Sequence, residues 1–193
     1  MSDSRIRTLV LVGIFAALAF VVTVLVRPTF NEFLTFDFKD TIIGIAGFLL
    51  GPLVAVAIAC LVATLEMFIS GTGLVGLIMN IVATVGFAGV AAWIYTRKPS
   101  LRNAAIGVVV GTLVMTAAML VLNYLITPIY QGVPRPVVAA MLVPVFLPFN
   151  LLKGGANALL IMLLYKPVMR ALSAIGIADE ADTVQEAGVS QHE

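Results

Sequence analysis

Long apolar runs separated by short polar segments make up most of this chain. A helix that crosses a lipid bilayer needs about 20 consecutive apolar residues. Five runs approach or exceed that length: Thr8–Val26, Thr41–Ile69, Leu74–Tyr95, Asn103–Ile126 and Val143–Tyr165. This pattern predicts an all-α integral membrane protein.

The first run has two interpretations. Arg5 and Arg7 precede it and Arg27-Pro28 ends it, an arrangement that a secretory signal peptide shares. No small-x-small cleavage site follows the run, and its apolar part is long for a signal peptide. We therefore expect it to be retained as a membrane span.

The second run is too long for one untilted helix, and Gly51-Pro52 divides it. Proline starts helices well and interrupts them badly, so we expect a short helix over Thr41–Leu50 and a full span over Pro52–Ile69. The short helix would cover only about 15 Å. It can cross only if protein shields it from lipid or the preceding loop extends it.

Two further segments break the pattern. Thr127–Pro144 contains four prolines and is expected to be a loop or a broken helix. Residues 178–193 form an acidic tail that we expect to be disordered, which leaves residues 1–177 as the membrane domain.

The distribution of basic residues decides between five spans and six. With five, the Arg97–Arg102 loop would lie outside, against the excess of basic residues on the cytoplasmic side. With six, both termini are cytoplasmic and the loop from Pro28 to Asp40 faces outward. The basic residues then divide into Arg5, Arg7, Arg97, Lys98, Arg102, Lys166 and Arg170 inside, and Arg27, Lys39 and Arg135 outside. We therefore predict a bundle of six transmembrane helices.

Composition excludes several other classes of protein. Of the 193 residues, 61% are apolar and 11% are charged, against about a quarter charged in soluble domains. A net charge of +1 offers no electrostatic footprint for nucleic acid. Cys60 and His192 are single residues of their types, so no intrachain disulfide, thiolate or histidine metal site, or Ser-His triad is available.

Polar residues inside the predicted spans cluster at one depth. The helical rise places Glu66, Asn80, Asn123, Asn150 and Lys153 in the outer third of the bilayer. Thr84 shares a helix face with Asn80, and Asn157 shares one with Asn150 and Lys153. Gly154 and Gly155, beside Lys153, permit the close approach of a neighbour or a ligand.

Such a cluster has two interpretations. It can form a pocket for a polar small molecule, lined by the aromatic residues Phe30, Phe33, Phe36, Phe38, Tyr124, Tyr130, Phe146 and Phe149. It can instead be structural, with Glu66 pairing Lys153 and asparagines bonding helices together. The coincidence in depth favours the pocket.

Two surface features each have two interpretations. The outer loop, residues 31–40, mixes aromatic and charged residues and is either an interfacial belt or a lid over the pocket. Gly13, Ala16 and Ala17 form a small-residue face on the first helix, for docking a partner or for internal packing. No phosphate-binding G-x-x-x-x-G-K-[ST] loop is present, so the chain would need a partner to power transport.

Three segments give the chain a family resemblance over about residues 8–170. They are Phe36–Asp40 leading to Gly47–Pro52, Ser70–Gly76 followed by Asn80, and Pro148–Gly154 with the sequence PFNLLKG. The chain resembles the S components, or substrate-binding subunits, of energy-coupling factor (ECF) vitamin transporters, and within them the riboflavin-binding branch.

The resemblance implies a six-helix subunit of a prokaryotic plasma membrane, with an outward-facing vitamin pocket closed by the first outer loop. It implies a membrane T component and two cytoplasmic ATPases as partners, with the Gly13-xxx-Ala17 face docking on the T component. The flavin-contacting asparagine and lysine of the family fall on Asn150 and Lys153. Riboflavin is then the transported ligand, with no cofactor and no covalent chemistry.

From both arguments we predict hydrogen bonds from asparagine and lysine side chains to the flavin, with aromatic rings against its faces. The predicted substrate-binding set is Asn150, Lys153, Asn80, Asn123, Glu66, Asn157, Thr84, Phe36, Asp40, Phe149 and Tyr124.

Three alternatives remain. The ligand could be another vitamin or small metabolite, such as pantothenate, a thiamin precursor or a queuosine precursor. The chain could be an intramembrane enzyme that uses Glu66 or Lys153 as acid or base. It could also be a structural assembly subunit without a ligand.

Overall fold

The structure is a computed structural model that describes residues 3–26, 29–31, 34–71 and 73–174, with side chains over 6–26, 36–71 and 73–171. The predicted acidic tail, His192 and the side chains of Phe30 and Phe33 lie outside the described residues. The described chain is a bundle of helices with one short hairpin. The helices are α1 (Asp3–Leu25), α2 (Lys39–Leu50), α3 (Pro52–Ser70), α4 (Gly73–Thr84), α5 (Val90–Arg97), α6 (Leu101–Gln131), α7 (Arg135–Met141) and α8 (Leu147–Ala174).

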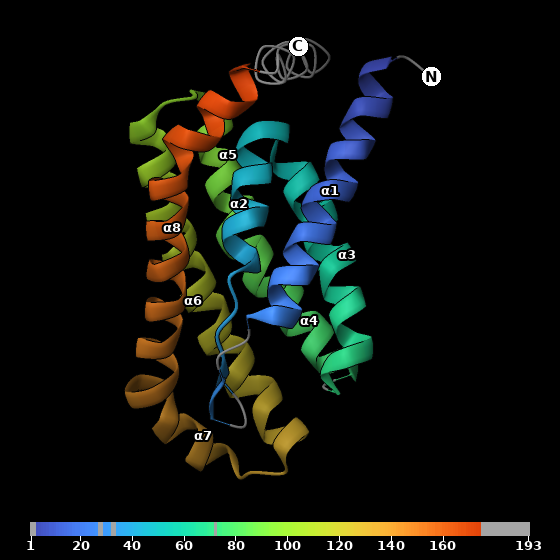
Figure 1. Ribbon diagram of the computed structural model, residues 1–193. Coiled ribbons are helices and arrows are strands. Elements are labelled where there is room, and N and C mark those ends of the chain that lie inside the picture. Colours follow the sequence, from blue (N-terminus) through green and yellow to red (C-terminus); the bar gives the residue numbers. More distant parts are fainter. Residues whose placement is uncertain (1–2, 27–28, 32–33, 72, 175–193) are drawn as a thin grey trace, which may run out of the picture.

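Two π-helical turns join neighbouring helices into longer spans. η1 (Val85–Gly89) connects α4 to α5, and η2 (Leu142–Phe146) connects α7 to α8. Strands β1 (Thr29–Asn31) and β2 (Leu34–Thr35) pair antiparallel, with Thr29 opposite Thr35. The hairpin lies between α1 and α2 in the chain, at the end of the bundle opposite the start of α1 (Figure 1).

Five helical segments of the described chain are long and apolar enough to cross a membrane. They are Ile6–Leu25, Pro52–Ser70, Gly73–Arg97, Leu101–Gln131 and Arg135–Ala171. The remaining predicted span, α2, has only 12 residues, and nearly all of them are buried. It packs against α1, α3, α5 and α8, and Figure 1 shows it at the centre of the bundle. Protein therefore shields this short helix from lipid, as its length requires.

The break between α2 and α3 is where the Gly-Pro pair predicts it. Gly51 has φ of +95° and ψ of 166°, a conformation that is essentially restricted to glycine. Its N–H still bonds to the carbonyl of Gly47, and Pro52 begins α3. The chain thus reverses direction in a single residue, and the short and full helices have the predicted limits to within two residues.

The proline-rich segment Thr127–Pro144 is a broken helix with little loop. α6 continues through Pro128 to Gln131 and ends at Gly132, which is left-handed with φ of +65°. Helix resumes at Arg135, and Pro144 lies inside η2. A proline removes one backbone hydrogen bond, and a π turn accommodates that loss. The fifth and sixth spans are consequently longer than Asn103–Ile126 and Val143–Tyr165.

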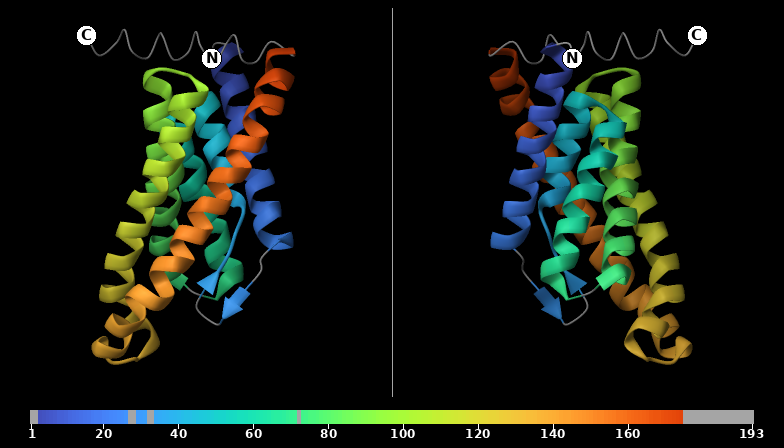
Figure 2. Two further views of the ribbon diagram at one scale, coloured as in Figure 1. Left: turned by 90° about the vertical axis from the view of Figure 1, so that its left-hand side faces the viewer. Right: turned by 90° about the vertical axis from the view of Figure 1, so that its right-hand side faces the viewer.

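The ends of the spans support the predicted topology. The start of α1 and the end of α8 lie at the same end of the bundle (Figures 1 and 2). Gly51 and the basic turn after Arg97 also lie at this end, which we call the cytoplasmic end; Gly71, Gly132 and the hairpin lie at the outer end. Arg97 stacks over the exposed ring of Trp93, 3.9 Å from its centroid, as an anchor at the interface with water.

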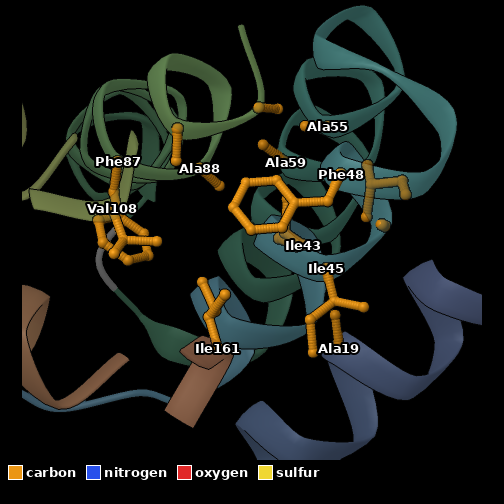
Figure 3. Packing of buried hydrophobic residues seen from close by; sticks show 14 of the residues in the cluster. Ala19, Ile43, Ile45, Phe48, Ala55, Ala59, Phe87, Ala88, Val108 and Ile161 are labelled. Atoms are coloured by element: carbon orange, nitrogen blue, oxygen red, sulfur yellow. The ribbon is translucent and has the colours of Figure 1, made fainter. Parts of the chain in front are cut away.

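The apolar core is made of small residues packed closely between helices. Figure 3 shows Phe48 among alanines and branched residues from α1, α2, α3, α6, α8 and the α4–α5 segment. A side chain on Gly107 or Gly111 would collide with the backbone of Ala91 or Phe87, so these two glycines let α6 touch the α4–α5 span. Toward the cytoplasmic end the Tyr95 ring stacks on Phe48, and its hydroxyl lies 3.0 Å from that of Tyr165.

Candidate functional site

A buried network of charged side chains lies where the segment before α2 enters the bundle. It contains three carboxylates and two lysines: Asp37, Lys39, Asp40, Glu66 and Lys153. Lys39 is 1% exposed and Lys153 is 7% exposed. Charges are rarely buried so deeply unless they are paired, so the pairing of this network explains how it persists inside a membrane bundle.

Lys39 is the centre of the first half of the network. Its Nζ lies 2.5 Å from Glu66 Oε2 on α3 and 2.8 Å from Asn80 Oδ1 on α4. Asn80 Nδ2 also donates to Glu66 Oε2, at 2.5 Å. The three side chains therefore form a closed triangle that joins α2, α3 and α4.

Lys153 is the centre of the second half. Its Nζ donates to Asp37 Oδ2 at 2.9 Å and lies 3.7 Å from Asp40 Oδ2. The hydroxyl of Thr84 donates to the other oxygen of Asp40 at 2.6 Å. Lys39 Nζ lies 3.7 Å from Asp37 Oδ2, which connects the two halves. Asp37 thus bridges the two lysines.

The network holds one more carboxylate than it holds lysines. Asp40 lies in the first turn of α2, where the helix dipole presents roughly half a positive charge. A carboxylate is favoured in the first turn of a helix, because the backbone N–H groups there carry partial positive charge. The amino end of α2 therefore contributes to balancing the negative charge.

Asn157 on α8 supplies a cap for α2 from a different helix. Phe38, at the N-cap position, makes no side-chain capping bond. Asn157 Oδ1 instead accepts from the backbone N–H of Thr41 at 3.1 Å and from its hydroxyl at 2.7 Å. Its Nδ2 donates to the carbonyls of Asp37 and Lys153. An asparagine amide offers two donors and two acceptor positions, so these bonds use its full capacity.

Two other predicted asparagines bond within their own helices. Asn123 Nδ2 donates to the carbonyl of Met119, and its oxygen accepts from the hydroxyl of Thr127. Asn150 Nδ2 donates to the carbonyl of Phe146, where η2 passes into α8. Both side chains are buried. Neither is part of the ion network.

The predicted aromatic residues have different surroundings. Phe36 is buried and its ring lies 4.8 Å from that of Phe38. Phe149 packs against the small outer cluster of Val138 and Phe146. Tyr124 is exposed on α6, unlike its buried neighbour Asn123. The structure therefore places Tyr124 on the outside of the bundle.

Two expectations about charge need correction. Glu66 pairs with Lys39, whereas Lys153 pairs with Asp37 and Asp40, so the suggested Glu66–Lys153 ion pair is not the arrangement found. Lys39 was expected among the outer basic residues and is instead buried in the network, 1% exposed like Asp40. The short apolar run after Lys39, Thr41–Leu50, was the signal for its burial. A helix this short reaches far into the membrane only if the residues before it enter the membrane too.

The small-residue face of α1 divides into exposed and buried parts. Ala17 is exposed, and nothing lies within 4 Å of where a side chain on Gly13 would project. Ala16 is 3% exposed and belongs to the apolar core. Ala16 therefore faces the bundle and does not contribute to the exposed face that Gly13 and Ala17 share.

Comparison with known proteins identifies the family. The sequence model of the family described as "ECF transporter, substrate-specific component" matches residues 7–165. The chain belongs to this family. As an S component it is a multi-pass plasma-membrane protein and a substrate-binding subunit of vitamin uptake, and not an enzyme.

Individual relatives of this S component are named riboflavin transporters. The chain is 29% identical over 177 residues to riboflavin transporter RibU of Staphylococcus aureus (strain TCH60). The aligned region covers 88% of this chain and 94% of the relative. It is 30% identical over 162 residues to riboflavin transporter FmnP of Bacillus subtilis (strain 168), covering 78% and 85%. A solved structure described as the S component of a bacterial ECF transporter superposes with a TM-score of 0.74 at 28% identity, covering 87% of this chain and 98% of that one.

Proposed function

We propose that this S component captures riboflavin from the outer side of the membrane and passes it to a T component with two cytoplasmic ATPases. The observation that carries the proposal is the match of residues 7–165 to the family of ECF substrate-specific components. The names of the relatives, RibU and FmnP, support riboflavin as the ligand.

The chemistry of riboflavin suits the residues of the outer half. The vitamin has a flat apolar ring system with a polar edge and a hydroxylated tail, and it carries no net charge. Asn123 and Asn150 offer neutral amides, and Phe36 and Phe149 offer rings at the outer end of the bundle. Neutral hydrogen-bonding groups and aromatic faces orient such a ligand without requiring a countercharge.

The transfer step requires partners. The sequence has no nucleotide-binding loop of the G-x-x-x-x-G-K-[ST] type, so ATP hydrolysis takes place on other subunits. The exposed face of Gly13 and Ala17 on α1 is the surface that we assign to the T component.

Ligand capture is tested on the purified chain in detergent. We expect the protein to copurify with a yellow flavin and to quench riboflavin fluorescence on titration. Asn150→Ala should weaken binding about three- to tenfold, the value of a hydrogen bond worth about 0.5–1.5 kcal/mol. Asn103→Ala at the cytoplasmic end is the matched control and should leave the affinity unchanged. A colourless preparation that ignores riboflavin and binds another vitamin would contradict the flavin assignment and retain the family.

A further inference from the structure

The amino end of α2 lies inside the bundle, and its first residues, Lys39, Asp40 and Thr41, are buried. Such a helix end needs fixed partners from the surrounding protein. The N–H of Thr41 is bonded to Asn157 on α8. On its other side the start of α2 is attached through the side chain of Lys39, which is bonded to Glu66 and Asn80. Figure 1 shows α2 between α3 on one side and α8 on the other, so these bonds hold it from both directions.

The bond to Lys39 is the stronger of the two attachments. Its ammonium and the Glu66 carboxylate are both nearly inaccessible to solvent and lie 2.5 Å apart. Removing one member of a buried ion pair leaves the other charge uncompensated, which is strongly destabilising. Asn80 bonds to both members, which fixes their geometry further.

Lys39 stands between the two carboxylates that hold Lys153. Asp37 precedes it by two residues and Asp40 follows it directly, and both pair with Lys153 on α8. A displacement of Lys39 would therefore move both aspartates and the buried ring of Phe36 with the same stretch of backbone. This segment is therefore attached to α3 and α4 through Lys39 and to α8 through Asp37 and Asp40.

We infer that Lys39, held by Glu66 and Asn80, is a positioning residue for vitamin capture. It fixes residues 36–41 so that Phe36, Asp37 and Asp40 face α8 and cover the binding site. Glu66 and Asn80 then serve the ion pair and do not contact the flavin. The inference rests on the proposed capture of riboflavin for its effect on the ligand, but the fixing of the segment is independent of any ligand.

The test removes the charge and then restores it in exchanged positions. Lys39→Met should raise the hydrogen–deuterium exchange of the amides of residues 36–41 about tenfold, and the dissociation rate of riboflavin by a similar factor. The double variant Lys39→Glu with Glu66→Lys re-forms the ion pair between α2 and α3, so both rates should return part of the way toward those of the unsubstituted protein. The return should be incomplete, because residue 39 then no longer offers Asp37 a positive charge. The absorption spectrum of the bound flavin should stay unchanged in Lys39→Met, because Lys39 does not contact the ring. Lys98→Met, at an exposed lysine of the cytoplasmic end, should change neither rate.

Each contrary outcome has a distinct meaning. Unchanged amide exchange in Lys39→Met would overturn the inference, and so would faster exchange with unchanged flavin dissociation or a shifted flavin spectrum. If Lys39→Met does not fold, Glu66→Gln replaces it, since the amide keeps the shape and loses the charge. If the unsubstituted protein binds no flavin, the proposed function fails, while amide exchange alone still confirms or refutes the fixing of the segment.

Discussion

Asn157 shows how much one buried side chain can connect. It bonds to Thr41 with its oxygen and to two backbone carbonyls with its nitrogen, so it joins α8 to the start of α2 and to the segment before it. A buried polar group without a partner is costly inside a membrane bundle. Loss of one of these bonds therefore destabilises the protein mainly because it leaves a buried donor or acceptor unpaired.

The contribution of this cap can be measured with two matched substitutions. Thr41→Val removes the hydroxyl that donates to Asn157 and keeps the side-chain shape. We expect the free energy of unfolding in detergent to fall by about 1–2 kcal/mol. Thr64→Val removes a hydroxyl that bonds only within α3 on an exposed face, and should change stability by less than about 0.5 kcal/mol. Equal effects of the two substitutions would show that the cap contributes nothing special.

For single residues, the sequence predicted which polar side chains come together better than it predicted which of them pair. The spacing of Asn150, Lys153 and Asn157 placed them on one face of a helix, and two of them, Lys153 and Asn157, do meet the segment before α2. The spacing of residues within one helix does not identify the partner of each side chain, because the partners lie on other helices. That is why Glu66 was matched with Lys153, when Lys39 lies closer to it.

Among the elements, α2 has the most unusual construction. It is short, nearly all buried, starts at a charged residue and ends at a glycine that no other residue type replaces without strain. Its contacts with α1, α3, α5 and α8 compensate for its length. The Gly51-Pro52 break was predictable because the local chemistry decides it. The continuation of α6 through Pro128 was not, because tertiary packing can tolerate a proline in a long helix.

The strain at this break gives a prediction for the element. Gly51→Ala forces a side chain into a backbone conformation at φ +95° and should lower stability by about 1–3 kcal/mol. Gly155→Ala is the matched control, because this glycine lies within α8 with nothing within 4 Å of an added Cβ. Alanine should stabilise that position by about 0.5–1 kcal/mol. Thermal unfolding of both variants in one detergent makes the comparison, and a stable Gly51→Ala protein would contradict the strained geometry.

For the molecule as a whole, the pattern of apolar runs and basic loops predicted the helical bundle and which ends of the spans lie together. The number of spans depended on the loop at Arg97–Arg102, which does lie at the same end as both the start of α1 and the end of α8. The sequence did not predict which side of α1 faces the bundle. Ala16 and Ala17 are adjacent in sequence and differ completely in exposure, since one faces the core and the other lies outside.

The exposed face of α1 gives a prediction about assembly. Ala17→Trp adds bulk outside the bundle, so riboflavin affinity should stay within about twofold, a difference of less than 0.5 kcal/mol. Copurification with a coexpressed T component and its ATPases should be lost, because a close helix–helix approach requires small residues. Ala117→Trp, on an exposed position of α6, serves as the control and should retain the complex. Retention of the complex by Ala17→Trp would move the docking surface elsewhere.

The bonds that join the start of α2 to α3, α4 and α8 have a consequence for biosynthesis. During synthesis Asp37, Lys39 and Asp40 emerge first, Glu66 and Asn80 follow, and Lys153 and Asn157 emerge only with α8. A charged residue left alone in the hydrocarbon costs at least about 2.5–3.5 kcal/mol, so the nascent second helix has no stable place in the lipid by itself. It must wait near the translocon or the headgroups until its counterions have been made. The charged network at the centre of the bundle is thus completed only when α8 has been made, more than 110 residues after Lys39.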